Sequence, residues 1–92
     1  MSSFEIIYHP LVVHDDIPKL SAEWKTKIQK AIGERLTTHP ETYGKPLRKS
    51  LKGYRKLRVG DYRVIFLLEK NLVKILIIQH RSVVYDRINK RT

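Results

Sequence analysis

The 92-residue sequence contains no cysteine and no long apolar run. Without cysteine the chain has no disulfide framework and no thiolate ligand for a metal. None of its apolar stretches approaches the ~18 residues that a membrane-spanning helix needs. The first residues predict a strand rather than a signal peptide. We therefore expect a cytoplasmic protein without membrane contact, which forms a single domain over residues 1–92.

Acidic residues are scarce, because 19 Lys and Arg stand against 9 Asp and Glu, a net charge of +10. Residues 1–40 hold five basic and five acidic side chains, whereas residues 41–92 hold fourteen and four. The whole excess therefore lies in the second part of the chain. Charge segregated in this way favours an anionic partner, which could be nucleic acid, an anionic membrane surface or an acidic protein. The alternative is a basic protein that its charge keeps soluble.

Apolar periodicity predicts an α+β domain. Alternation predicts strands over residues 4–9, 54–59, 62–69 and 72–80. An apolar stripe after the capping residue Ser21 predicts a helix that reaches Leu36. Residues 11–20 form either a short helix or a loop, and the tail from residue 82 forms a possible short helix. We expect an antiparallel sheet, consisting of the N-terminal strand and a three-strand meander, with two helices packed on one face.

The second and third predicted strands are joined by Gly60 and Asp61, a pair that suits a two-residue hairpin turn. This turn pairs Arg58 with Arg63, and the alternation of side chains then places Tyr54, Lys56, Arg58 and Arg63 on one face. Like charges that face each other across a sheet repel, so this arrangement calls for an anion. Arginine binds phosphate oxygens through two parallel N–H groups, and tyrosine can stack on a base. The alternative is a solvated face of long side chains.

If Lys70 and Asn71 form the turn between residues 62–69 and 72–80, the register of the last strand can also be predicted. Arg63 would then lie opposite Ile78, and Lys74, Leu76 and His80 would share the cationic face. His80 could carry a proton, because imidazole ionises near neutral pH. A polar residue at the end of a strand is the equally acceptable alternative for this histidine.

The segment LKGYRKLRVGDYRVIF (residues 51–66), followed by an apolar strand and HRSVVY (residues 80–85), resembles the RelE branch of the RelE/ParE toxin superfamily. Members of this branch enter the ribosomal A site and cut mRNA there. The resemblance therefore implies a RelE-like toxin of a type II toxin–antitoxin system, acting as an endoribonuclease. It also implies that the ribosome, with its mRNA and rRNA, and a RelB-like acidic or amphipathic antitoxin are partners.

Site residues are carried over by position within these two motifs. The resemblance implies catalytic roles for Lys56, Arg63, Arg81 and Tyr85. His80 completes the expected catalytic set as a proton carrier, although some members of the family lack it. The resemblance also carries over Arg58 as a basic position. We expect it to bind RNA together with Tyr54, Arg55, Lys52 and Lys49, and the last two lysines to steer the protein toward rRNA. Tyr54 stands where the best-studied members have another lysine, and the division of acid and base roles stays open.

The chemistry of RNA cleavage fits such a set of residues. The ribose 2′-OH is the nucleophile, so the protein must take its proton, stabilise the phosphorane with cations and protonate the 5′ oxygen. The products are a 2′,3′-cyclic phosphate and a 5′-hydroxyl end. We expect no metal and no small-molecule cofactor, since no acidic cluster accompanies the basic residues. The rival interpretations are a ParE-like toxin that inhibits DNA gyrase, a non-catalytic nucleic-acid-binding module, and a remnant that binds only an antitoxin.

Overall fold

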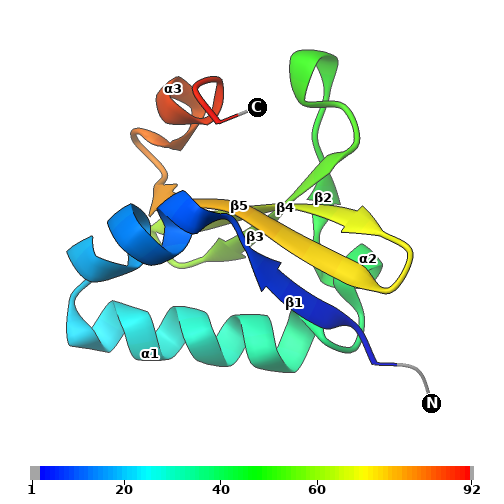
Figure 1. The fold of residues 1–92 in the computed structure, drawn as a ribbon, viewed down its shortest axis with the longest axis horizontal. Helices are drawn as coiled ribbons and strands as arrows, with labels where there is room; N and C mark the ends of the chain where they lie inside the picture. The colour runs from blue at the N-terminus through cyan, green and yellow to red at the C-terminus, as the bar shows by residue number, and fades with distance from the viewer. Residues whose placement is uncertain (1–2, 92) are drawn as a thin grey trace.

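The computed structural model describes residues 3–91. Figure 1 shows a twisted sheet with one long helix, α1, along one face. The strands are β1 (Glu5–Tyr8), β2 (Lys45–Pro46), β3 (Tyr54–Val59), β4 (Tyr62–Glu69) and β5 (Leu72–His80). The helices are α1 (Ala22–Ala31), α2 (Pro40–Tyr43) and α3 (Val84–Ile88). Short helical turns are η1 (Val12–Asp16), η2 (Ile17–Lys19), η3 (Ile32–Leu36) and η4 (Lys49–Leu51). None of the helices in this described part is long and apolar enough to cross a bilayer.

The strands form one sheet in the order β1-β5-β4-β3-β2. The predicted α+β class and the three-strand meander are confirmed. Two details differ from expectation, because β1 joins β5 in parallel and the two-residue strand β2 extends the sheet beyond β3. The sheet is therefore mixed. Alternation shows which side chains share a face of a strand, but it carries no information about the direction of its neighbour.

The main core lies between the sheet and α1. The predicted cap is present, since the backbone N–H of Trp24 donates to Ser21 Oγ at 3.3 Å. The helix continues through η3, which matches the predicted end at Leu36. Ile28 and Leu36 are buried against sheet residues such as Phe66. The uncertain stretch before this helix is helical, in the two turns η1 and η2.

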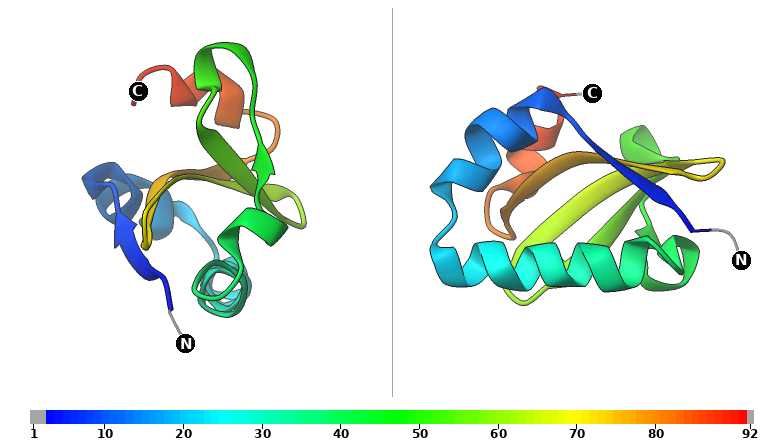
Figure 2. Two further views of the ribbon diagram at one scale, coloured as in Figure 1. Left: turned by 90° about the vertical axis from the view of Figure 1, so that its right-hand side faces the viewer. Right: turned by 60° about the horizontal axis from the view of Figure 1, so that its bottom comes forward.

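The opposite face of the sheet carries α3. Val84 and Ile88 of this helix are fully buried in a second cluster with Ile65, Leu76 and Ile77 of the sheet. Figure 2 shows α3 and the loop before β3 on the side of the sheet that faces away from α1. The predicted C-terminal helix is therefore present, and it covers part of the face on which we expected the cations.

The register of the meander is partly as predicted. Arg58 pairs with Arg63 across β3 and β4, as expected. The predicted β4–β5 register is correct near the Lys70–Asn71 turn but wrong by one residue beyond Ile75. The reason is a bulge, which leaves Leu76 unpaired between Ile75 and Ile77. A bulge adds one residue to a single strand and reverses the faces beyond it. Arg63 consequently lies opposite Gln79.

The prediction that His80 lies on the cationic face is wrong because of the same bulge. This residue pairs with Tyr62, whose side chain packs against the main core on the α1 side. Lys74 pairs with Leu67 and stays on the expected face. His80 therefore does not share the face of Arg58 and Arg63.

Candidate functional site

Two cross-strand pairs bring four cations together at the edge of the sheet. Lys45 lies opposite Lys56 across β2 and β3, and Arg58 lies opposite Arg63 across β3 and β4. With Tyr43 from the end of α2, these side chains line a pocket of about 150 Å³. We call this group of five residues the cationic pocket.

The described residues supply no acidic partner for the four charges of the cationic pocket. Within residues 3–91, none of its lysines and arginines forms an ion pair. Like charges on neighbouring strands repel, so bringing these four cations together destabilises the protein. An anion would relieve the repulsion, and the planar guanidinium groups match the oxygen atoms of phosphate.

Arg63 is the most firmly held member of the pocket. Its side chain is largely buried, with 9% of its surface exposed. Nη1 donates to the carbonyl oxygens of Gly60 at 2.8 Å and Tyr62 at 3.0 Å. Both bonds use the same nitrogen, so the described residues leave Nε and Nη2 available for a ligand. The hairpin turn therefore orients one edge of the guanidinium and leaves the other edge to the pocket.

Arg81 lies beside the same turn, although it does not line the cationic pocket. Its backbone N–H donates to the carbonyl of Asp61 at 2.8 Å, and its Nε lies 3.7 Å from Asp61 Oδ1. Both side chains are well exposed, so the pair can separate readily. Tyr85, in the first turn of α3, also lies outside the pocket and is 42% exposed. The structure thus brings Arg81 to the hairpin turn that holds Arg63, whereas Tyr85 belongs to α3.

His80 occupies a different environment from the other predicted catalytic residues. Its ring lies edge-on to that of Tyr62, with centroids 5.6 Å apart. Its Nδ1 accepts a hydrogen bond from the backbone N–H of Ser82 at 3.1 Å and lies 2.8 Å from Ser82 Oγ. These contacts suit a residue that closes the end of a strand.

The predicted RNA-binding residues are dispersed. Arg58 lines the cationic pocket, whereas Arg55 faces the α1 side and donates to the carbonyl of Gly44 at 3.0 Å, so it ties β3 to α2. Tyr54 packs against the second cluster. Lys49 and Lys52 are exposed in and after η4, away from the pocket.

Tyr43 and Lys45 were missed by the sequence analysis. Both lie in a segment that reads as a loop between two prolines, so neither belonged to a predicted strand. Only the β2–β3 register shows that Lys45 stands beside Lys56. The sequence signal that could have indicated them is the presence of a basic residue, Lys45, two positions after an aromatic one, Tyr43. Tyr43 is 47% exposed, and the guanidinium of Arg35 lies 5.6 Å from its ring centroid.

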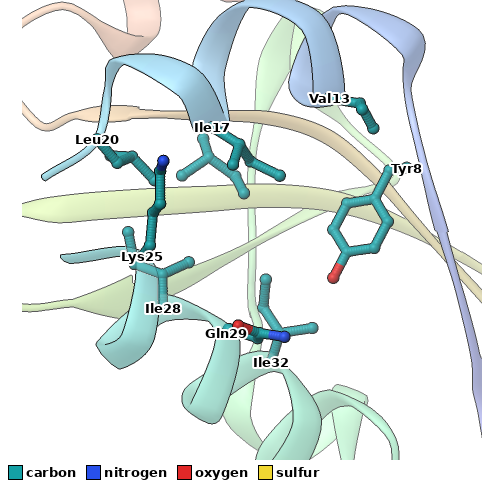
Figure 3. Close-up of a pocket in the computed structure, with 9 residues that line it drawn as sticks. Tyr8, Val13, Ile17, Leu20, Lys25, Ile28, Gln29 and Ile32 are labelled. Carbon is teal, nitrogen blue, oxygen red and sulfur yellow. The ribbon is translucent and has the colours of Figure 1, made fainter. Parts of the chain in front are cut away.

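A second cavity, of about 320 Å³, opens on the α1 side of the sheet. Figure 3 shows Tyr8 pointing toward α1, with Lys25 and Gln29 at the rim and aliphatic side chains around them. Burial raises the pKa of Tyr8 above its usual value. This apolar lining does not suit phosphate. Within the described residues, no group of His, Asp and Glu is arranged to hold a metal ion.

Comparisons with known proteins give relatives in sequence and in structure. Toxin RelE of Mycobacterium tuberculosis is 40% identical over 52 residues, which is 54% of each chain, so the chain spans about half the length of this curated relative. A chain of the RelBE2 toxin–antitoxin complex from M. tuberculosis superimposes with a TM-score of 0.81 at 26% identity, over 89% of this chain and 95% of that one. YafQ from Escherichia coli, at 22% identity and a TM-score of 0.54 over 89% and 98%, shows the fold alone.

The family assignment comes from the sequence as a whole. Residues 2–85 match a family described as the ParE toxin of the type II toxin–antitoxin system parDE. The match includes every residue of the cationic pocket as well as Arg81 and Tyr85. The chain therefore belongs to this ParE toxin family, within the RelE/ParE superfamily.

Proposed function

We propose that this toxin is an endoribonuclease that cuts mRNA in the ribosomal A site. The observation that carries the proposal is the uncompensated Arg58–Arg63 pair, which faces Lys56 and Lys45 in the cationic pocket. A scissile phosphate would supply the negative charge that this pocket lacks. The 40% identity to Toxin RelE over 52 residues supports the RelE-like activity.

The proposed reaction uses the RNA's own 2′-OH as nucleophile. Arg63 and Lys56 stabilise the charge that develops on the phosphorane, since preorganised cations in a partly dry pocket are worth more than in water. Arg81 joins them by swinging away from Asp61, its exposed ion-pair partner. Tyr85 and His80 are the candidates for proton transfer, and both would have to approach the phosphate in the bound state. The leaving 5′ oxygen takes a proton and departs as a hydroxyl.

The proposed partners are a cognate antitoxin and the ribosome with its mRNA and rRNA. The antitoxin is expected because a structural relative was solved in the toxin–antitoxin complex RelBE2. An acidic or amphipathic chain would complement the charge of +10. Lys49 and Lys52 are exposed near η4, and we propose that they steer the toxin toward rRNA rather than act on the phosphate. This activity would take place in the cytoplasm.

Cell-free translation with purified ribosomes tests the proposal. The wild-type toxin should cut mRNA only on ribosomes, and the fragments should end in a 2′,3′-cyclic phosphate and begin with a 5′-hydroxyl group. Lys70→Gln, which removes an exposed charge in the β4–β5 turn, is the control and should cut normally. Intact mRNA after incubation with folded wild-type toxin and translating ribosomes would reject the proposal.

The second candidate is inhibition of DNA gyrase. The specific observation in its favour is the family match itself, which is to a ParE toxin. A supercoiling assay with purified gyrase separates the two functions, because a ribonuclease should leave supercoiling unaffected. Activity in neither assay would leave a non-catalytic binding module.

A further inference from the structure

A second cationic groove, of about 600 Å³, lies between α1 and the β3–β4 hairpin. It is lined by Lys27, Lys30, Ala31, Glu34, Arg35, Arg58, Val59 and Gly60. The charge distribution along the chain does not predict this groove, since the first 40 residues are electrically neutral as a whole. Folding nevertheless selects three of their five cations for this one groove.

The helix contribution comes from a single face. Lys27, Lys30 and Glu34 are spaced three and four residues apart, and this spacing aligns side chains along a helix. From Lys27 to Arg35 the row extends about 12 Å. Lys27 is partly neutralised, because its Nζ lies 2.8 Å from Glu23 Oε1. Within residues 3–91, Lys30 and Arg35 form no ion pair, so these two carry the free charge.

The groove is continuous with the cationic pocket. Arg58 lines both of them. A second connection runs through Arg35 in the groove, whose guanidinium lies 5.6 Å from the ring centroid of Tyr43 in the pocket. Because β2 pairs only with Arg55 and Lys56, β3 beyond Lys56 forms an open edge, which we call the β3 edge. The cationic surface passes around this edge, from the face away from α1 to the side of α1 itself.

We propose that an RNA strand bound at the cationic pocket continues around the β3 edge into this groove, where Lys30 and Arg35 contact its phosphates. The identity of the strand rests on the proposed function. The chemistry of the groove favours a polynucleotide over a protein, because protein interfaces depend on buried aromatic and aliphatic anchors. Among the described residues that line the groove, Ala31 and Val59 are the only apolar side chains. Its four cations outnumber its one carboxylate, Glu34, so the groove keeps the positive charge that phosphate contacts need.

Binding of single-stranded RNA outside the ribosome tests the inference. The probes are 2′-O-methyl RNAs, which cannot be cut, of about 4 and about 16 nucleotides. Fluorescence anisotropy would measure their affinity for the wild type and for the double variant Lys30→Gln/Arg35→Gln across a range of salt concentrations. The control is Lys25→Gln/Lys70→Gln, which loses the same charge outside the groove. Thermal unfolding would verify that both variants are folded.

The long RNA should bind the groove variant severalfold more weakly than the control. The slope of log affinity against log salt should fall in magnitude by about 1.4, because each phosphate contact to a single strand contributes about 0.7. The short RNA, which the pocket alone can hold, should bind both variants equally. Equal binding of the long RNA to the two variants would overturn the inference, as would a wild type that binds both RNAs equally well.

Other outcomes separate this inference from the proposed function. Normal cleavage on ribosomes together with unaltered RNA binding by the groove variant would reject the groove alone. Absence of cleavage by the wild type would reject the proposed function, while a selective loss of long-RNA binding would still support the groove. If the groove variant bound RNA normally but lost binding to a glutamate-rich peptide, the groove would belong to a protein partner.

Discussion

Asp16 and Arg91 form a bidentate ion pair that ties the end of the chain to η1. Arg91 Nη1 lies 2.5 Å from Asp16 Oδ2, and Nη2 lies 2.7 Å from Oδ1. The same carboxylate accepts hydrogen bonds from the backbone N–H of Ile78 at 2.9 Å and from Gln79 Nε2 at 2.6 Å. Because β1 pairs with β5 only as far as Ile75, Asp16 satisfies a backbone donor on an otherwise open strand edge.

The first prediction concerns this buried carboxylate. Asp16 is fully buried, so Asp16→Ala should deprive the buried Arg91 guanidinium of its bidentate partner and leave it, within the described residues, only the longer ionic contact with Asp15, at 3.7 Å. The free energy of unfolding should fall by about 3–5 kcal/mol. Urea unfolding measures the change. Glu69→Ala is the control, since Glu69 is an exposed carboxylate that pairs with Lys74 at the surface and has no ion pair with Arg91. Similar unfolding midpoints for the two variants would show that the buried pair adds no stability.

The second prediction concerns Arg63. Arg63→Ala should lower the rate of mRNA cleavage on ribosomes by about 10²–10³-fold, as expected for loss of one preorganised donor to a developing charge. Arg63→Lys should recover only part of the rate, because a lysine cannot reproduce the two parallel N–H groups. Arg63 also holds the hairpin turn, so the stability of each variant needs a separate measurement. Cleavage by folded Arg63→Ala at the wild-type rate would exclude a role for this residue.

The third prediction concerns Arg81 and its partner Asp61. In the proposed mechanism Arg81 leaves the Asp61 carboxylate to reach RNA, so this carboxylate competes with RNA phosphate for Arg81. Asp61→Asn removes the competing charge and should tighten the binding of a 2′-O-methyl RNA severalfold. Arg81→Ala should weaken the same binding and abolish cleavage. Anisotropy titrations at low salt would detect both changes. An Asp61→Asn variant that binds RNA as the wild type does would place Arg81 outside the binding surface.

The fourth prediction concerns Tyr43, whose ring lines the cationic pocket. Tyr43→Ala should cost about 1–3 kcal/mol of RNA-binding free energy if a base stacks on the ring. Tyr43→Phe keeps the aromatic face and should bind normally. A loss with both substitutions would instead assign the hydroxyl group as the contact, and no loss with either would exclude Tyr43 from the interface.

The β3–β4 hairpin was predictable because its register depends only on local turn chemistry. Gly60 adopts a φ of +57°, as the turn requires, and every predicted pair from Lys56 to Ile65 across this turn is present. The β4–β5 register was not predictable in the same way. Every residue from Ile75 to Ile78 is apolar and buried, so the sequence carries no mark of the face on which each one lies.

In the candidate site, too, the residues placed by the local hairpin were predictable, and those placed by tertiary packing were not. Lys56, Arg58 and Arg63 converge because they belong to the predictable hairpin. Lys45 and the groove residues Lys30 and Arg35 come from elements far away in sequence, so only the tertiary packing brings them to Arg58. Arg55 shows the opposite case, in which a residue of the basic motif is used to hold the fold.

The fifth prediction concerns the backbone at Gly60. An alanine there would adopt a left-handed conformation that costs about 1–2 kcal/mol. Its Cβ would also lie 2.5 Å from Cη2 of Trp24, and this indole has little room to move because it packs against Tyr62 at 4.8 Å between centroids. Gly60→Ala should therefore destabilise the fold by more than the backbone cost alone. It should also weaken RNA binding, since the Gly60 carbonyl accepts a hydrogen bond from Arg63.

Gly33→Ala is the matched control for this change. Gly33 lies in the helical continuation of α1, and apart from its own helix backbone and its chain neighbours no atom lies within 4 Å of the added Cβ. Alanine should therefore stabilise this position by about 0.5–1 kcal/mol relative to glycine. Urea unfolding should thus give shifts of opposite sign for the two variants. Equal stability of Gly60→Ala and the wild type would mean that the turn can change its conformation at no cost. Such a turn could not hold the Arg63 guanidinium in a fixed orientation.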